Sequence, residues 1–298
     1  MLTVGLVGYL IIAGPAALLS YLKGEMYWRF TTFDLSVVPL FVLMGQFAAK
    51  AGLSQALFKA ANVWLGHYRG GIAMAAVGGC GGFGAISGSS LATAATMGQV
   101  ALPELKRYNY AGSLATGALA AGGTLGILIP PSVVLIIYAI MVEANIVTLF
   151  QAAFIPGILA ALGYMATIAI VVRINPEAGP AGPKATRSEQ FLALLDIWPV
   201  IVIFLLVMGG IYLGFFTPTE GAGVGSVGTF LIALSRGGMK FKDFIDALIS
   251  TATTTALIFL ILLGAAVFNA FLGFSQLPLA AATFFKESGL PPMSVLLM

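Results

Sequence analysis

Residues 70–103, which read GGIAMAAVGGCGGFGAISGSSLATAATMGQVALP, form a long uncharged stretch with a glycine-rich centre. Six glycines fall between positions 78 and 88, where we expect an α-helix to be hard to sustain. At 1.5 Å per residue, each flank of that centre is long enough for only about half a bilayer. We therefore predict a re-entrant hairpin with its tip near residues 87–90.

Basic residues on both sides of this run support the hairpin. The basic clusters are Lys50, Lys59 and Arg69; Lys106 and Arg107; Arg173, Lys184 and Arg187; and Arg236, Lys240 and Lys242. Because cytoplasmic loops carry an excess of Lys and Arg, we place these clusters in the cytoplasm and the charge-balanced loop 23–34 outside. The segments before and after residues 70–103 then both lie in the cytoplasm, so residues 70–103 must enter the membrane and return to the same side. Such backbone is tolerated only where protein buries it or water reaches it.

Composition makes the whole chain an integral membrane protein. Of its 298 residues, 59% are hydrophobic and 8% are charged, whereas a soluble domain carries about 25% charged residues. The net charge of +3 is spread over short loops, which favours membrane orientation over nucleic-acid binding. One cysteine (Cys80) excludes an internal disulfide and a cysteine metal cluster, and one histidine (His67) excludes a multi-histidine site.

Other apolar runs supply the remaining spans. They are residues 1–22, 35–49, 108–142, 144–172, 197–219, 221–235 and 247–285. The first run has no basic residue before it, so we do not expect a cleaved signal peptide. The polar residues 174–196 are expected to form a cytoplasmic linker.

The run 108–142 is too long for an upright span and contains the pair Pro130-Pro131. Proline removes a backbone donor and clashes with the preceding turn, and the residue before it avoids helix. We predict two half-helices joined by an unwound segment at 126–131, with Pro131 in the first turn of the second half-helix. Ser89 or Ser90 is expected to cap the returning arm of the hairpin.

These two breaks favour a transport site. Each helix N-terminus carries about +0.5 charge and unpaired N–H groups, which suit an anion, and the carbonyl ends of the preceding arms suit sodium. The alternative is that the glycines only permit close helix packing. Paired discontinuous helices favour the site.

Two short matches indicate an internal repeat. Residues 41–45 (FVLMG) resemble 260–264 (LILLG), and residues 52–55 (GLSQ) resemble 273–276 (GFSQ). The charge assignment gives the two copies opposite orientations, as in many secondary transporters. On this offset Met298 corresponds to about Val77, so we expect the second hairpin to be missing and the chain to be truncated.

Three acidic residues are expected to lie outside the hydrocarbon. We place Glu220 at the outer interface, in the first turn of a helix capped by Thr219. Asp243 and Asp246 are expected in a solvated loop.

Three motifs in order carry a family resemblance: GGFGAISGSS at 81–90, GILIPPS at 126–132 and FTPTE at 216–220. From about residue 2 to the end, the chain resembles the large membrane subunit of tripartite ATP-independent periplasmic (TRAP) transporters of dicarboxylates or sialic acid. The resemblance implies an all-α, inverted-repeat, elevator-type fold in the bacterial inner membrane. It also implies sodium-coupled uptake of a small organic anion, with a small four-helix membrane subunit and a periplasmic substrate-binding protein as partners.

The resemblance also implies a division of the chain and a set of site residues. Residues 1–69 would hold scaffold-type spans and a cytoplasmic interfacial helix, 70–142 the first transport half, 143–246 connecting spans, and 247–298 the start of the second repeat. The residues implied for sodium, mostly through backbone carbonyls, are Ser87, Gly88, Ser89, Gly126, Ile127 and Pro130. Those implied for substrate are Ser89, Ser90, Pro131 and Ser132.

Other function classes remain to be weighed. A truncated or degenerate membrane scaffold without transport activity is the main alternative, because family members usually have one more N-terminal span and a second hairpin. A channel is disfavoured because no span carries a continuous polar stripe. An intramembrane enzyme is disfavoured because no nucleophile–base pair is present, and no cofactor other than the coupling sodium ion is expected.

Overall fold

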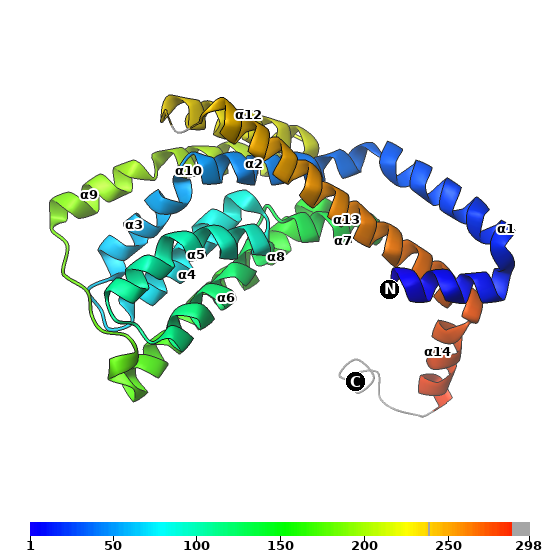
Figure 1. The fold of residues 1–298 in the computed structure, drawn as a ribbon, viewed down its shortest axis with the longest axis horizontal. Coiled ribbons are helices and arrows are strands. Elements are labelled where there is room, and N and C mark those ends of the chain that lie inside the picture. Colours follow the sequence, from blue (N-terminus) through cyan, green and yellow to red (C-terminus); the bar gives the residue numbers. More distant parts are fainter. Residues whose placement is uncertain (238, 288–298) are drawn as a thin grey trace. The chain divides into compact units, whose positions relative to one another are not determined.

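The computed structural model describes residues 1–237 and 239–287, which form helices joined by short connections (Figure 1). The expected second-repeat residues 288–298 lie outside the described residues. The chain forms two bodies, residues 34–253 and residues 1–33 with those from 254 onward. Within these described residues, four helical segments are long and apolar enough to cross a membrane, and two bent helix pairs raise this number to six if each is one span.

The elements of the larger body follow one another closely. They are η1 (Phe33–Ser36), α2 (Val37–Lys50), α3 (Leu53–Leu65), α4 (Gly71–Ser87), α5 (Ser90–Arg107), α6 (Gly112–Leu128), α7 (Val133–Met141), α8 (Ile146–Ile174), η2 (Pro176–Ala178), α9 (Arg187–Asp196), α10 (Trp198–Phe204), the π-helical η3 (Leu205–Gly209), α11 (Gly210–Tyr212), α12 (Pro218–Ser235) and the beginning of α13 (Phe241–Ser275). Both the hairpin and the interrupted helix belong to this body.

Helix α4 is the centre of this body and contacts α2, α3, α5, α6 and α8. It is continuous through the glycine-rich stretch, so the prediction that a helix would fail there was wrong. The reason is close packing: a Cβ on Gly84 would lie 2.7 Å from Gly126 Cα, and one on Gly79 would lie 2.5 Å from Met97 Cε. Close packing of this kind, against backbone at Gly84 and against a side chain at Gly79, offsets the low helix propensity of glycine.

The predicted hairpin is formed by α4 and α5, which reverse direction at Gly88 and Ser89. Its arms contain 17 and 18 residues, about 26 Å each at 1.5 Å per residue. The prediction treated the glycine-rich centre as non-helical and so gave each arm only about half the thickness of a bilayer. The observed arms are longer than that. That the hairpin is re-entrant stays a prediction.

The predicted interrupted helix consists of α6 and α7, with a bend of 45° between them. The break covers residues 129–132, so Gly126 and Ile127 are still helical, contrary to the predicted unwinding at 126–131. Pro131 does not begin the second half-helix as predicted. Ser132 is its N-cap instead, because the Ser132 side chain accepts a hydrogen bond from Leu135 N at 3.4 Å.

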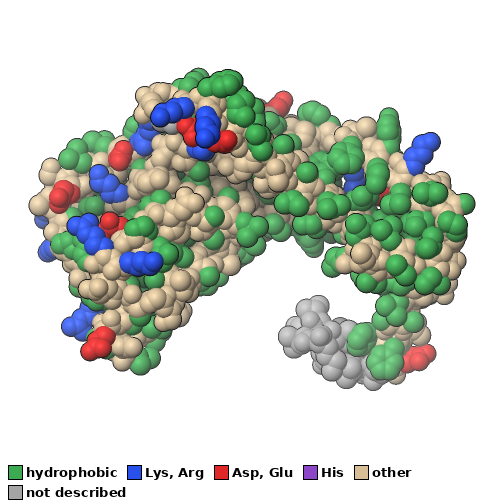
Figure 2. Space-filling model, viewed as in Figure 1, with side chains coloured by type: hydrophobic (Ala, Val, Ile, Leu, Met, Phe, Trp, Pro, Cys, Tyr) green, Lys and Arg blue, Asp and Glu red, His purple; other side chains and the backbone are tan. Residues whose placement is uncertain are grey.

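Many Lys and Arg side chains gather on one side of the larger body. Figure 2 shows Lys and Arg side chains concentrated toward the end that carries α9, at the left of the view. Lys50 pairs with Asp243 at 2.9 Å, and Arg236 pairs with Asp196 at 3.0 Å. Asp243 and Asp246 lie in α13 rather than in a loop as predicted, because Asp243 also accepts from Lys240 N and so begins the helix.

The linker 174–196 is folded against the hairpin base rather than free. Gly70 N donates to Gly179 O at 2.8 Å, Ala111 N donates to Ala178 O at 3.0 Å, and Gly182 N donates to Gly66 O at 2.8 Å. The last ten residues form α9, which begins with a capping box. The linker thus joins the ends of α3, α4 and α6.

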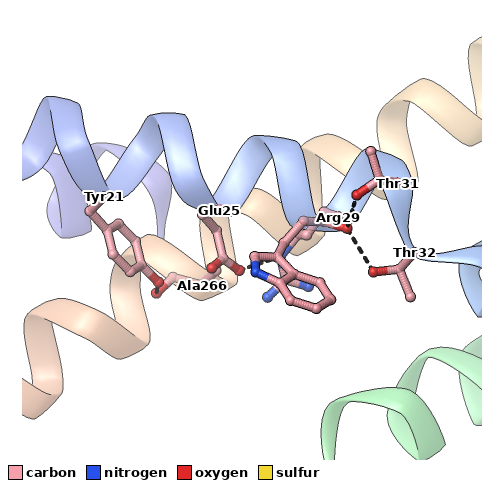
Figure 3. Close-up of polar contacts among 7 residues, drawn as sticks. Tyr21, Glu25, Arg29, Thr31, Thr32 and Ala266 are labelled. Carbon is pink, nitrogen blue, oxygen red and sulfur yellow. Dashed lines mark hydrogen bonds and ion pairs between the residues drawn. The ribbon is translucent and has the colours of Figure 1, made fainter.

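In the smaller body, α1 (Leu2–Thr31) kinks at Gly14, whose φ is 81°, just before Pro15. The helix runs on through residues 23–31, so the predicted outer loop 23–34 was wrong over most of its length. Figure 3 shows why: Arg29 pairs with Glu25 one turn away, and the Thr31 and Thr32 hydroxyls donate to carbonyls of the preceding turn. Tyr21 Oη donates to Ala266 O in α13 at 3.2 Å.

The proposed repeat has similar local structure in its two copies. In the first, α2 is followed by Gly52 with φ 72° and then α3; in the second, α13 is followed by Gln276 with φ 54° and then α14 (Leu277–Glu287). The second break comes at Gln276 rather than at Gly273, the match to Gly52. The inverted orientation of the copies stays a prediction.

Candidate ion and anion site

The hairpin tip rests directly on the break between α6 and α7. Gly88 has a left-handed backbone (φ 60°), and its carbonyl accepts a hydrogen bond from Val133 N at 3.1 Å. A Cβ on Gly88 would lie 2.9 Å from Pro131 O. Glycine is therefore required here both for its conformation and for the close approach of two backbones.

Two hydroxyl groups meet inside the tip. Ser87 Oγ and Thr93 Oγ1 are 2.8 Å apart, and both side chains are buried. Ser89 caps α5, since its Oγ accepts from Ala92 N at 3.3 Å, which confirms one of the two predicted caps. Thr93 was not among the predicted site residues. The sequence shows that Thr93 follows the predicted cap by one helical turn. It does not show that the Thr93 side chain contacts Ser87, because this contact depends on how the two arms of the hairpin pack.

The two prolines free carbonyl groups at the end of α6. Pro130 and Pro131 have no N–H, so neither can donate to the carbonyl four residues earlier, on Gly126 and Ile127 respectively. Ile127 O instead accepts a hydrogen bond from Ser132 Oγ at 2.8 Å. Because of the two prolines, the carbonyl oxygens of Gly126 and Ile127 are left without their usual helical N–H donors and are free to bind other groups.

Gly126 brings these carbonyls against the hairpin. A Cβ on Gly126 would lie 2.6 Å from Thr93 Oγ1 and 2.7 Å from Ser89 O. No side chain fits between α6 and the tip at this point. The C-terminal end of α6 and the N-terminal end of α5 are consequently in direct contact.

Most of the predicted site residues come together. The hairpin tip and the break bring into one cluster Ser87, Gly88, Ser89, Gly126, Ile127, Pro131 and Ser132. Ser90 is the first residue of α5, and its carbonyl lies 3.4 Å from the position of a Cβ on Gly123, one turn further from the break. Pro130 is buried in the break itself.

The cluster offers both kinds of helix end. Helices α4 and α6 end there with carbonyl groups, and α5 and α7 begin there with N–H groups and serine caps. Within the described residues, no three His, Cys, Asp or Glu side chains lie close enough to hold a metal ion. An ion bound at this cluster would therefore be held by carbonyl and hydroxyl oxygens and by the dipoles of the helix ends.

Glu220 does not contribute to this cluster. It is the third residue of α12, and its carboxylate accepts from the N–H and hydroxyl of Thr217 at 2.8 and 2.9 Å. The cap is therefore Thr217 and not Thr219 as predicted, because Pro218 occupies the first helical position and sets the helix start one residue after Thr217.

The whole chain, residues 1–298, matches the family described as tripartite ATP-independent periplasmic transporter, DctM component. The chain belongs to this family of TRAP transporter large permeases. It is therefore a multi-pass protein of the bacterial inner membrane. The family resemblance inferred from the three sequence motifs is confirmed.

Several curated relatives differ in the substrate that their names give. The chain is 36% identical over 267 residues to the C4-dicarboxylate TRAP transporter large permease protein DctM of Pseudomonas aeruginosa, with 89% of this chain and 62% of the relative covered. It is 31% identical over 291 residues to the sialic acid TRAP transporter large permease protein SiaM of Vibrio cholerae, with 97% and 67% covered. It is 28% identical over 299 residues to the ectoine TRAP transporter large permease protein TeaC of Halomonas elongata, with 99% and 69% covered. The chain thus spans about two thirds of the length of these TRAP permeases.

Proposed function

We propose that this TRAP permease chain forms the sodium-binding and substrate-binding half of an uptake transporter for a small organic anion, such as a C4-dicarboxylate or a related carboxylate. Sodium would bind carbonyl and hydroxyl oxygens of the hairpin tip and the α6 end. The carboxylate of the substrate would face the N-terminal ends of α5 and α7. Both would move across the membrane with the hairpin, in an elevator movement.

The observation that carries this proposal is the Gly88–Val133 hydrogen bond at 3.1 Å, which joins the hairpin tip to the break. Through it, two helix C-termini and two helix N-termini meet without a charged side chain. A partly dehydrated sodium ion needs such neutral oxygens, and a carboxylate needs such N–H groups. Ser87, Thr93 and Ser132 add hydroxyl groups at the same point.

The partners follow from the family. We propose that the permease works with a small four-helix membrane subunit and receives its substrate from a periplasmic binding protein. The relatives named for C4-dicarboxylates and sialic acid support a carboxylate substrate. The relative named for ectoine shows that substrates vary within the family.

Uptake of isotope-labelled organic acids into proteoliposomes tests the proposal. The permease as its organism makes it, its small subunit and its binding protein would be reconstituted with and without an inward sodium gradient. We expect uptake that requires both the gradient and the binding protein. Uptake without sodium would remove the ion site, and no uptake from a correctly assembled complex would favour the scaffold alternative.

A substitution at the tip links this activity to the cluster. Ser89→Leu removes the side-chain cap of α5 and puts a bulky side chain at the hairpin turn, so we expect loss of sodium-dependent uptake with normal membrane insertion. Ser235→Leu, at an exposed position near the end of α12, is the matched control. Equal uptake by the two variants would contradict the site assignment.

A further inference from the structure

A cavity with two arginines in its walls lies in the larger body, away from the hairpin tip. It has a volume of about 380 Å³ and is lined by Tyr68, Arg69, Met74, Ala169, Val172 and Arg173. Two arginines therefore face one space whose other walls are aromatic or apolar. The cavity lies between the beginning of α4 and the last turn of α8.

Backbone contacts fix the two arginines on either side of this cavity. Gly70, with φ 74°, donates its N–H to Gly179 O, and a Cβ on it would lie 2.9 Å from Val172 Cγ2. The residues next to this contact are Arg69 on one segment and Arg173 on the other. Their side chains start from a rigid junction rather than from mobile loops.

Neither arginine has a carboxylate partner among the described residues. Arg69 and Arg173 take part in none of the ion pairs, which involve Arg29, Lys50, Arg107 and Arg236. Glu177 lies one turn beyond Arg173 but forms no ion pair with it. The neighbouring cavity of about 310 Å³ differs in this respect, because its Lys59 and Lys184 share their walls with Glu189.

The cavity opens beside an apolar face of α8. Exposed residues at helical spacing run along that face toward Arg173: Ile155, Leu159, Leu162, Ala166 and Ile170. Ile155, Leu159 and Leu162 are more than half exposed in this body. Helix α8 is long and apolar enough to cross the membrane, so its exposed face is suited to contact lipid tails.

We propose that this cavity binds the headgroup phosphate of an anionic membrane phospholipid, with the acyl chains along the apolar face of α8. A guanidinium group binds phosphate with two parallel hydrogen bonds, which a lysine cannot do. Basic pockets at the membrane surface bind lipid headgroups. A free anion would gain nothing from the apolar walls, which is why a lipid fits better than inorganic phosphate. This inference is independent of the proposed transport activity.

Native mass spectrometry of the detergent-purified permease, titrated with phosphatidylglycerol, tests the proposal. We expect the double variant Arg69→Gln/Arg173→Gln to bind the first lipid at least about tenfold more weakly, because several charge-assisted hydrogen bonds are lost. The control Lys59→Gln/Lys184→Gln removes the same charge from the neighbouring cavity and should bind as the unmodified protein does. Arg69→Lys/Arg173→Lys keeps the charge without the paired hydrogen bonds and should be intermediate.

Three results would overturn the proposal. They are equal lipid binding by the Gln variant and its lysine control, equal binding of phosphatidylglycerol and phosphatidylethanolamine, and displacement of the lipid by an equal concentration of inorganic phosphate. The last result would identify a free-anion site instead. If the double Gln variant fails to fold, as judged by gel filtration and thermal unfolding, the single variant Arg173→Gln and the Lys variant provide the same comparison.

Discussion

The carbonyl oxygen of Gly88 lies 3.1 Å from the backbone nitrogen of Val133 and accepts its hydrogen bond. Gly88 is the turn of a helical hairpin, and Val133 is the first residue of the half-helix after a double-proline break. One backbone contact therefore holds two interruptions together. In a membrane interior such non-helical backbone must be satisfied by protein or by water in a cavity, and each interruption here partly satisfies the other.

Gly88→Ala is expected to weaken this contact. The left-handed backbone at Gly88 costs an alanine roughly 1–2 kcal/mol, and the new Cβ would lie 2.9 Å from Pro131 O. We expect a lower unfolding temperature in detergent and loss of sodium-dependent uptake. Gly98→Ala in α5 is the matched control, since no atom lies within 4 Å of the added Cβ and alanine favours helix; it should lower neither quantity.

Gly126→Ala is expected to separate α6 from the hairpin tip. Its Cβ would lie 2.6 Å from Thr93 Oγ1 and 2.7 Å from Ser89 O, so one backbone must move; overpacking of this kind costs about 1–3 kcal/mol. We expect sodium-dependent uptake to fall sharply in the proteoliposome assay. Gly117→Ala is the control, because its Cβ enters open space on the same helix. An equal loss of uptake in this variant would mean that α6 tolerates no added methyl group, and it would contradict a specific need for contact between Gly126 and the hairpin tip.

Thr93→Val is expected to leave the Ser87 hydroxyl without its partner at 2.8 Å. A buried hydroxyl that loses its hydrogen bond costs about 1–3 kcal/mol, which thermal unfolding would register. Thr93→Ser keeps the hydroxyl and should retain most of the stability. If Thr93 also binds sodium, the Val variant alone should need a higher sodium concentration for half-maximal uptake. Identical sodium dependence in both variants would limit Thr93 to a structural role.

Thr186→Ala is expected to loosen α9 and to change its pH dependence. Hydrogen bonds from the backbone and side chain of Thr186 lower the pKa of Glu189. A carboxylate whose pKa is lowered by folding stabilises the fold above its ordinary pKa, and this contribution is lost as the pH falls through the lowered value. We expect faster amide exchange in α9 of the variant at neutral pH, and a smaller difference from the unmodified protein below the lowered pKa.

Thr167→Ala is the control for this measurement, because Thr167 is exposed and bonds only to Gly163 O in its own helix. Exchange rates would be corrected for the intrinsic effect of pH. A difference between Thr186→Ala and the unmodified protein that persists unchanged at low pH would contradict the role of the Glu189 carboxylate. Uptake should be unaffected in both variants, since neither threonine lies near the hairpin tip.

The sequence by itself determined the class of the protein, its two helix interruptions and most of the residues that meet at the hairpin tip. Low charge and long apolar runs are typical only of a membrane protein. Pro130-Pro131 favours a break because two successive residues lack an N–H and the residue before a proline avoids helix. The three motifs identified the family. The four basic clusters were predicted to be cytoplasmic, and this stays a prediction; the structure pairs two of their members, Lys50 and Arg236, with Asp243 and Asp196.

Only the tertiary structure decided that residues 23–31 and the glycine-rich residues 78–84 are helical. The glycines at 78–84 are helical because α6 and α5 approach them closely, a benefit that local propensity does not contain. Residues 23–31 are helical, although their charges suggested a loop, because Glu25 and Arg29 pair along the helix. Packing between segments placed Thr93 beside Ser87 and Gly126, and it placed Arg69 and Arg173 in the walls of one cavity. The sequence shows the hydrophobic and charge pattern of each segment by itself. Which residues of two segments contact each other depends on how the two helices pack, and this packing is not visible in either segment.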